Sequence, residues 1–234
     1  MTQEELRTEN DAFQFIKTHG KELTTKFAPP DVCHSVTNPV SLFMAGSPGA
    51  GKTEVSKSFI KKFNDMPMRI DADEIRPLCS GYTGANAHLF QKAANKGVNI
   101  LYDHALHKSI NCILDGTFAY AGAEQNIARS LKYKRRVELW FVYQDPVKAW
   151  EFTKARETRE ARHVSKDVFI RAFVESRHNV QVVKEHFKGQ IELNLLLKDY
   201  EDGQEDFQLN ISAAELDRRT DGRYTEDTLQ KILT

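Results

Sequence analysis

An eight-residue loop in the chain has the composition needed to hold a polyphosphate. It matches the pattern G-x-x-x-x-G-K-[ST] and consists of Gly46, Ser47, Pro48, Gly49, Ala50, Gly51, Lys52 and Thr53. Its glycines let backbone N–H groups approach phosphate oxygens, because no Cβ atom intervenes. Lys52 can reach the β- and γ-phosphates, and the Thr53 hydroxyl suits Mg²⁺. The apolar strand at 40–45 and the helix expected from Lys52 make a chance match a poor alternative, so the loop predicts binding of Mg²⁺ with ATP or GTP.

Two aspartates follow the next apolar segment, at 66–70. Asp71 and Asp73 occupy alternate positions, so they face different directions and suit different tasks. One carboxylate could organise Mg²⁺ through water or contact the substrate, which is the role we expect for Asp71. The other could take the proton from an acceptor hydroxyl, which makes Asp73 the expected catalytic base of a kinase. The alternative is that both merely cap the following turn.

A third apolar segment, 110–114, ends in Asp115, Gly116 and Thr117. An acid and a hydroxyl that leave a strand together can contact a substrate, and we expect Asp115 and Thr117 to do so. Asp115 could equally lie behind the Mg²⁺ ion, as an acid at the end of a buried strand does in many P-loop proteins. A simple turn is the alternative.

A charged helix expected at 149–163 carries the arginines Arg156, Arg159 and Arg162. Their spacing of three places them along one stripe of the helix. Guanidinium groups on such a segment can neutralise a phosphoryl group in transfer and exclude water, so the segment is expected to be a catalytic lid. Glu157 and Glu160 alternate with them, and a solvated, salt-bridged face is the alternative.

Apolar periodicity predicts that helices and strands alternate along the chain. Further strands are expected at 137–143, at 191–197 and, in a polar tail, at 207–211, with helices at 52–63, 87–108, from about 147, and 166–187. This alternation indicates an α/β P-loop fold: a mainly parallel sheet with helices on both faces and ligands at the carboxyl ends of the strands. We expect a helical segment at 1–36, a kinase core at 37–200 with its lid near 150–165, and an extension at 201–234 packed on or beside the core.

Composition argues against several classes of protein. Thirty-three basic residues balance 33 acidic ones, which gives no sign of a nucleic-acid partner. No apolar run is long enough for a membrane span and the N-terminal residues lack a secretion signal, so a cytoplasmic protein without membrane attachment is expected. Cys33, Cys79 and Cys112 lack metal-ligand spacing and are expected to be inert buried thiols.

The ordered set of motifs resembles the zeta toxin family of P-loop kinases from about residue 10 to residue 200. The resemblance rests on the P-loop, an Asp-x-Asp strand end, an acid-Gly-Thr strand end and a later arginine lid that continues into 162–166. It implies Asp73 as the base, Lys52 and Thr53 as nucleotide and Mg²⁺ ligands, Thr117 as a substrate contact, and two lid arginines among three candidates. It also implies UDP-N-acetylglucosamine as the acceptor and an antitoxin protein as a partner.

Two positions depart from that family pattern. The strand-end motif reads Asp115-Gly116-Thr117 rather than Glu-Gly-Thr, and no arginine closely follows it. Asn99 stands about where the family has a substrate-binding glutamate, and Asp103 or His104 is only a loose substitute. The phosphate-donor half of the pattern is therefore better preserved than the acceptor half.

The function expected from these patterns is transfer of a γ-phosphoryl group to a hydroxyl of a nucleotide-sugar-like substrate by a toxin of a toxin–antitoxin system. A kinase of another hydroxyl substrate, such as a nucleoside, a nucleotide or an antibiotic, is one alternative. A nucleic-acid-end kinase and a non-catalytic nucleotide-binding module are the others, and neutral composition disfavours the first of these two.

Overall fold

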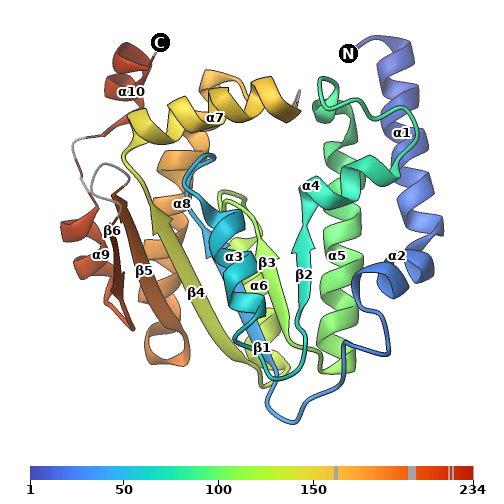
Figure 1. The fold of residues 1–234 in the computed structure, drawn as a ribbon, viewed down its shortest axis with the longest axis horizontal. Coiled ribbons are helices and arrows are strands. Elements are labelled where there is room, and N and C mark those ends of the chain that lie inside the picture. The colour runs from blue at the N-terminus through green and yellow to red at the C-terminus, as the bar shows by residue number, and fades with distance from the viewer. Residues whose placement is uncertain (161–162, 200–203, 221, 223, 234) are drawn as a thin grey trace.

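One six-stranded sheet organises the chain (Figure 1). The computed structural model describes residues 1–160, 163–199, 204–220, 222 and 224–233. The strand order is β2-β3-β1-β4-β5-β6, and every neighbouring pair is parallel except β5 with β6, which is antiparallel. The strands are β1 (Val40–Ala45), β2 (Met68–Asp71), β3 (Cys112–Asp115), β4 (Arg136–Tyr143), β5 (Glu192–Asp199) and β6 (Gln204–Gln208).

The central strand β1 is buried on both faces, as its run of apolar residues requires. Phe43 belongs to a large apolar core on one face of the sheet, whereas Leu42 and Met44 belong to a smaller core on the other. Because successive side chains of a strand point to opposite faces, this alternation fixes the register of β1 against β3 and β4. The P-loop that follows β1 is positioned by that register.

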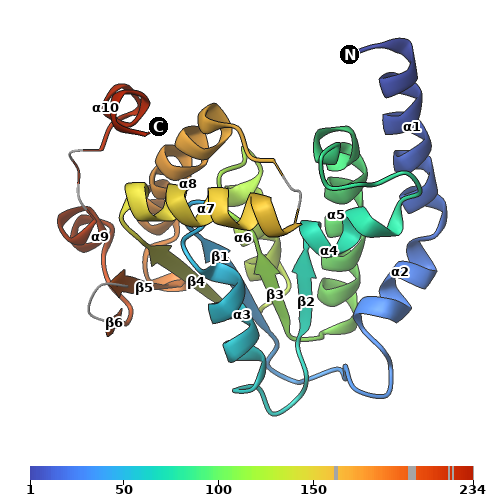
Figure 2. The same ribbon diagram turned by 45° about the horizontal axis from the view of Figure 1, so that its top comes forward.

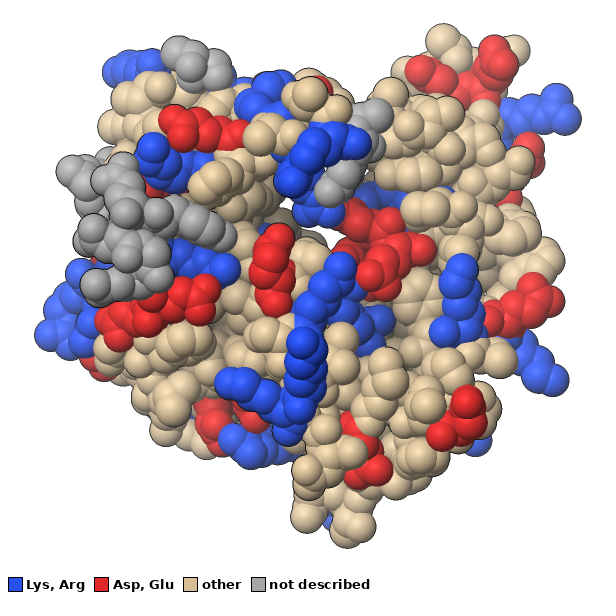
Figure 3. Space-filling view, in the orientation of Figure 1, with Lys and Arg blue, Asp and Glu red and all other residues tan. Residues whose placement is uncertain are grey.

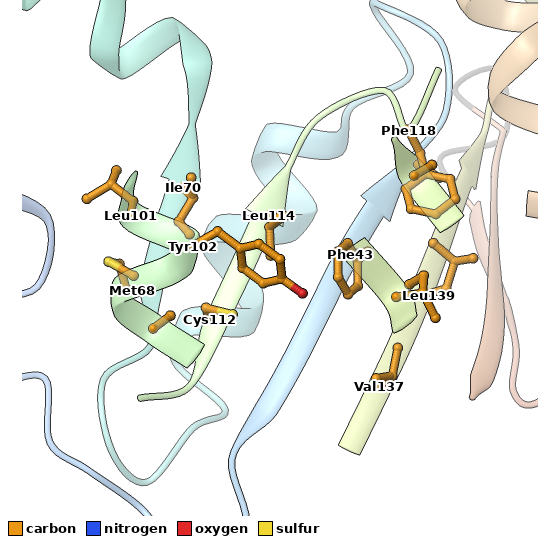
Figure 4. Close-up of a cluster of buried hydrophobic side chains, with 14 of the residues drawn as sticks. Phe43, Met68, Ile70, Leu101, Tyr102, Cys112, Leu114, Phe118, Val137 and Leu139 are labelled. Carbon is orange, nitrogen blue, oxygen red and sulfur yellow. The ribbon is translucent and has the colours of Figure 1, made fainter. Parts of the chain in front are cut away.

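Helices cover both faces of the sheet. Helix α3 (Lys52–Ile60) packs on the smaller core through Val55 and Phe59. The opposite face is covered by α5 (Gln91–Lys108), α6 (Ala123–Lys132) and α8 (Lys166–Phe187). On that face Tyr102 of α5 lies edge-on to Phe43, with ring centroids 6.0 Å apart (Figure 4). The fold is therefore the expected α/β arrangement with a mainly parallel sheet.

Several further elements complete the described structure. Helices α1 (Gln3–Thr18) and α2 (Gly20–Phe27) pack on α5, beside the β2 edge of the sheet (Figures 1 and 2). After β2 come α4 (Ala72–Ile75) and the 3₁₀ turns η1 (Arg76–Leu78) and η2 (Ala87–Phe90), and η3 (Lys188–Gln190) precedes β5. Helices α9 (Ala213–Arg219) and α10 (Glu226–Ile232) pack on α8.

The lid segment expected from the sequence contains helix α7 (Pro146–Glu160), which crosses the carboxyl ends of the central strands (Figures 1 and 2). Asp145 caps its first turn, because its Oδ1 accepts from the Val147 amide at 2.9 Å. The Tyr224 hydroxyl donates to Oδ2 of the same Asp145 at 2.6 Å. The segment that leads into α10 therefore contacts the residue that caps the N-terminus of α7.

Cys33, Cys79 and Cys112 are buried free thiols, as expected. Within the described residues, none of the helices combines the length and the apolar character needed to cross a bilayer.

Candidate active site

The P-loop has a backbone conformation that requires glycine. Gly46, Gly49 and Gly51 have φ angles of 132°, 73° and 85°, a region that residues with a Cβ rarely adopt. A Cβ atom at Gly46 would also lie 2.3 Å from the carbonyl oxygen of Val142 on β4. The loop can therefore run closely over the sheet edge only with glycine at these positions.

The positive end of α3 meets the loop at Lys52, the first helical residue. The first N–H groups of a helix have no partner inside it and favour an anion. The Lys52 ammonium donates to the Ser47 carbonyl oxygen at 2.6 Å, so the lysine lies over its own loop. Thr53 is half-buried in the same first turn. This glycine cradle, ammonium and hydroxyl fit the phosphates and Mg²⁺ of a nucleoside triphosphate, as the sequence predicts.

Helix α8 holds the first residue of the P-loop in place. The buried Gly46 amide donates to the Ser176 hydroxyl at 2.7 Å and to the Thr117 carbonyl oxygen at 3.2 Å. One turn later in α8, the side-chain amide of Asn179 donates to the Phe118 carbonyl oxygen at 2.9 Å. Phe118 has a φ of 61°, which a bulky residue adopts only when its surroundings enforce it. The P-loop and the loop after β3 are thus held together through α8.

A buried arginine joins the ends of β2 and β3. Asp71 and Asp115 are direct partners in the parallel register of the two strands. The Arg69 guanidinium contacts Asp71 Oδ2 at 2.5 Å and donates through Nε to Asp115 Oδ2 at 3.1 Å. It also pairs with Glu74, and Ser56 of α3 donates to Asp115 Oδ2 at 2.6 Å. Both aspartates therefore already have partners behind the P-loop.

One guanidinium shared by three carboxylates cannot fully neutralise each of them. Burial raises the pKa of Asp71 to about 6, and the nearby charges of Asp73 and Asp115 act in the same direction against the opposing effect of Arg69. For Arg69, burial alone would lower the pKa, but the charges of Asp115 and Asp71 outweigh it and raise the pKa above its ordinary value. The arginine therefore stays charged, whereas the pKa of Asp71 rises to about 6.

Asp73 lies in α4, where Asp71 caps the helix by accepting from the Asp73 amide at 2.8 Å. The Asp73 side chain is one quarter exposed. The Oδ1 atom accepts from the buried guanidinium of Arg76, and the Oδ2 atom lies 3.9 Å from Arg156 of α7. The expected base is thus partly open and lies beside an arginine of the expected lid.

The expected lid arginines differ in their surroundings. Arg156 is partly exposed and lies near Asp73, whereas Arg159 is exposed. Arg162 lies outside the described residues. Glu157 pairs with Lys154 and His163 on the same segment, so part of this face carries the local salt bridges named above as the alternative.

Asn99 is the expected site residue that the structure does not bring to this cluster. It is exposed on α5, and its amide donates to the Asn95 carbonyl oxygen of its own helix at 3.0 Å. Conversely, Arg69, Arg76, Ser176 and Asn179 were not expected at the site. A charged residue two positions before Asp71 in an apolar strand is a signal that could have identified Arg69.

A hollow on this face of the molecule lies below the end of α7 (Figure 3). Acidic side chains gather along one of its edges and basic side chains lie above and beside it. The P-loop packs against α7, and Arg156 of the same helix lies 3.9 Å from Asp73. A P-loop, a partly open carboxylate and a nearby arginine at the carboxyl ends of parallel strands are the features of a P-loop kinase.

Comparison with known proteins identifies the family. The family model described as Zeta toxin matches residues 25–207, and the chain therefore belongs to the zeta toxin family of P-loop kinases of toxin–antitoxin systems. Membership implies phosphoryl transfer from a nucleotide with Mg²⁺, as the site residues also indicate. A search of curated protein sequences found no match.

Solved structures share the fold at low sequence identity. A structure of the PezAT chromosomal toxin–antitoxin system of Streptococcus pneumoniae matches with a TM-score of 0.68 and 16% identity over 99% of this chain and 93% of that one. The AvrRxo1-ORF1:AvrRxo1-ORF2 structure with sulphate ions has a TM-score of 0.61, 15% identity and coverage of 94% and 73%. The Pnkp1/Rnl/Hen1 RNA repair complex matches with a TM-score of 0.52, 16% identity and coverage of 66% and 48%.

Proposed function

We propose that the chain transfers the γ-phosphoryl group of ATP or GTP to a hydroxyl of a small molecule. The observation that supports this proposal best is the position of Asp73, one quarter exposed and 3.9 Å from Arg156 of α7. A hydroxyl beside Asp73 would lose its proton to the carboxylate and form a new bond to the γ-phosphorus. The bond from the γ-phosphorus to the bridging oxygen of the β-phosphate would break, and the nucleoside diphosphate would leave.

The other residues of the site have supporting tasks in this proposal. Lys52 and the P-loop amides would hold the phosphates, and Thr53 would be a ligand of Mg²⁺, which would supply positive charge against the phosphates. Arg156 stabilises the phosphoryl group in transfer, and its helix limits access of water. Asp71 and Asp115 support these residues indirectly, because both contact the buried Arg69 behind the P-loop.

The acceptor class is proposed from family membership. A nucleotide sugar, with UDP-N-acetylglucosamine as the first compound to test, is the acceptor that the family resemblance implies. The substrate-contact roles proposed for Thr117 and Asn99 belong to this part of the proposal. Thr117 lies at the P-loop, where its carbonyl oxygen accepts from Gly46, whereas Asn99 would need an acceptor that extends along the exposed face of α5.

The partner is proposed on the same basis. The PezAT match comes from a toxin–antitoxin system, and we propose that an antitoxin protein binds this chain and blocks its nucleotide site. Co-expression of a neighbouring small reading frame with the chain would be expected to relieve growth inhibition. Growth inhibition that persists with every adjacent reading frame would contradict the antitoxin proposal.

The decisive experiment for the kinase proposal incubates the protein and Mg²⁺ with a cell extract and γ-labelled ATP or GTP. Mass spectrometry then identifies the metabolite that gains a phosphate, and purified UDP-N-acetylglucosamine is tested in parallel. The matched control is Asp73→Asn, which should keep nucleotide affinity and lose transfer by at least ~10²-fold, the usual scale for removal of a general base. Equal transfer by both proteins would sink the assignment of Asp73, and transfer to no metabolite would sink the kinase proposal.

A further inference from the structure

The side chain that holds the proposed base comes from one helical turn further along the chain. Arg76 follows Asp73 by three residues, a spacing that brings the two side chains to the same side of the turn. The Arg76 side chain is only 5% exposed, and one of its terminal nitrogens donates to Asp73 Oδ1. A partly exposed carboxylate is thus anchored from inside the protein.

Arg76 is itself held in place by α5. Its other terminal nitrogen donates to Oε1 of Gln91, the first residue of α5, at 2.5 Å. The Gln91 amide nitrogen donates in turn to Asn95 Oδ1 at 2.7 Å, which fixes the orientation of the Gln91 amide. An uninterrupted series of hydrogen bonds therefore connects Asp73 to the first turns of α5.

Packing fixes the distance between the two helices that this series joins. Ile75 of α4 is fully buried, and a Cβ atom at Gly97 of α5 would lie 2.8 Å from its side chain. Close contact at Gly97 lets α4 approach α5, so Arg76 can reach Gln91. The orientation of Asp73 is therefore set by a rigid helix rather than by the turn alone.

The two oxygens of Asp73 have different surroundings as a result. Oδ1 is bonded to the buried Arg76, whereas Oδ2 faces Arg156 of α7 at 3.9 Å. We propose that Arg76 is a positioning residue that fixes Asp73 through Oδ1, so that Oδ2 is the atom that receives the proton of the acceptor hydroxyl. This inference rests on the proposed kinase function and assigns a task to each oxygen of its base.

The energetics favour orientation over stability as the reason for this pair. Burial of a guanidinium costs free energy, and the resulting ion pair is weak evidence for stabilisation. Within the described residues, the buried Nε atom of Arg76 has no hydrogen-bond partner, which adds to that cost. A catalytic carboxylate benefits from a fixed direction, because a misplacement of about 1 Å can reduce a rate by about 10²-fold.

The chain offers a matched control for the loss of such a pair. Arg177 of α8 pairs with Asp217 of α9, its side chain is 16% exposed, and its Nε atom is also buried without a partner among the described residues. Arg177→Gln should therefore reproduce the structural cost of Arg76→Gln without any contact to Asp73.

The first test compares crystal structures of the unaltered chain, Arg76→Gln, Arg76→Lys and Arg177→Gln, each with Mg²⁺ and a non-hydrolysable ATP analogue. We expect one Asp73 conformer in the unaltered chain, in Arg177→Gln and in Arg76→Lys, but displacement or several conformers in Arg76→Gln. An unchanged Asp73 conformer in Arg76→Gln would overturn the inference. This test needs no acceptor, so it remains decisive if the proposed acceptor is wrong.

The second test measures formation of ADP from ATP, with water alone and with the acceptor found in the cell extract. We expect Arg76→Gln to lower kcat about 10²-fold with the KM for ATP changed less than about threefold, and Arg76→Lys to restore part of it. Because Arg76 acts through Asp73, the double variant Asp73→Asn/Arg76→Gln should be no slower than Asp73→Asn.

Additive losses in the double variant, or equal losses in Arg76→Gln and Arg177→Gln, would show that Arg76 serves stability only. Should Asp73→Asn turn over as fast as the unaltered chain, the proposed base itself would fail. The two failures are therefore distinguishable, because the second concerns Asp73 whether or not Arg76 is altered.

Discussion

The P-loop glycine Gly49 lies directly against the backbone carbonyl of Ala149 in α7. A Cβ atom at Gly49 would be 2.0 Å from the Ala149 oxygen and 2.7 Å from the Thr153 hydroxyl. Thr153 is buried, and its hydroxyl donates to the same carbonyl oxygen at 2.8 Å. The loop that we assign to phosphate binding and the helix that carries Arg156 and Arg159 are therefore packed together without space for even a methyl group.

Gly49→Ala should accordingly displace α7 from the loop. The added methyl meets backbone rather than a flexible side chain, and the φ of 73° is also unfavourable for alanine. We expect ATP affinity, measured by isothermal titration calorimetry, to fall by about tenfold or more, which corresponds to ~1.4 kcal/mol. Gly189→Ala is the control, since a Cβ at Gly189 meets nothing within 4 Å. Unchanged affinity in Gly49→Ala would contradict the close packing.

The positions of the lid arginines predict unequal effects on transfer. Arg156 lies 3.9 Å from Asp73, whereas Arg159 is exposed. Arg156→Met should reduce kcat by ~10²-fold or more, because a guanidinium that stabilises the transferring phosphoryl group is worth ~10³-fold or more in related enzymes. Arg159→Met should have a smaller effect. Single-turnover transfer from labelled ATP measures both, and a larger loss in Arg159→Met would reverse the assignment.

The raised pKa of Asp71 predicts a pH-dependent stability. Its ordinary pKa is 3.8 and its pKa in the fold is about 6, so between these values the folded state binds a proton that the unfolded state lacks. Stability from this group is fully present below pH 3.8 and is lost as the pH rises to about 6, by up to about 3 kcal/mol at ~1.4 kcal/mol per unit.

Asp71→Asn isolates this effect, because asparagine can still cap α4 but does not titrate. Urea unfolding without nucleotide or Mg²⁺ should show the variant gaining stability relative to the unaltered chain as the pH rises toward 6, with a constant difference above. A difference that does not change with pH would show that Asp71 titrates normally.

Removal of Arg69 should be among the more damaging single changes in the site. Arg69→Met leaves Asp71 and Asp115 without their shared cation in a buried place, and breaking a buried pair typically costs about 3–5 kcal/mol. Arg136→Met is a suitable control, since the Arg136 side chain is 57% exposed and its partner Glu192 is 40% exposed, and such exposed pairs contribute about 0–1 kcal/mol. Equal losses of unfolding free energy in the two variants would contradict the importance of the Arg69 cluster.

Local sequence patterns predict the central fold because each element carries its own signal. Helix α8 is predicted at 166–187, where the structure has it, since Ser165 caps its first turn and apolar residues recur along one face. Helix α6 is not predicted. Its preceding residue, Gly122, makes no side-chain cap, and Ala123, Ile127 and Ser130 are its buried residues. It packs against α8 and β4. Its segment is amphipathic, which is a local signal that the prediction missed.

The two helices of the polar tail are not predicted either. Helices α9 and α10 have seven residues each, too short to be stable alone, and depend on the buried Leu216 and Leu229. The strand expected at 207–211 overlaps the observed β6, Gln204–Gln208, only at 207–208. Burial by distant parts of the chain decides these elements.

The same distinction holds for the site. The P-loop and Asp73 stand out because their chemistry follows from residues close together in the sequence. Arg135 reads as part of a basic flank of β4, yet it is buried and donates to Ser41 and to the carbonyl oxygens of Ala105 and Ile110. Partners such as these lie dozens of residues away, so charge alone does not reveal whether an arginine is a solvated or an internal residue.

The central strand β1 ends in the P-loop, and its alternate side chains are anchored in two separate cores. A slip by one residue would exchange Phe43 and Met44 between the two cores. The position of the P-loop relative to the sheet is therefore set by a single register of β1, with no intermediate register available. Substitutions in either core should lower the fraction of molecules able to bind nucleotide, while the molecules that remain folded should bind it with undiminished affinity.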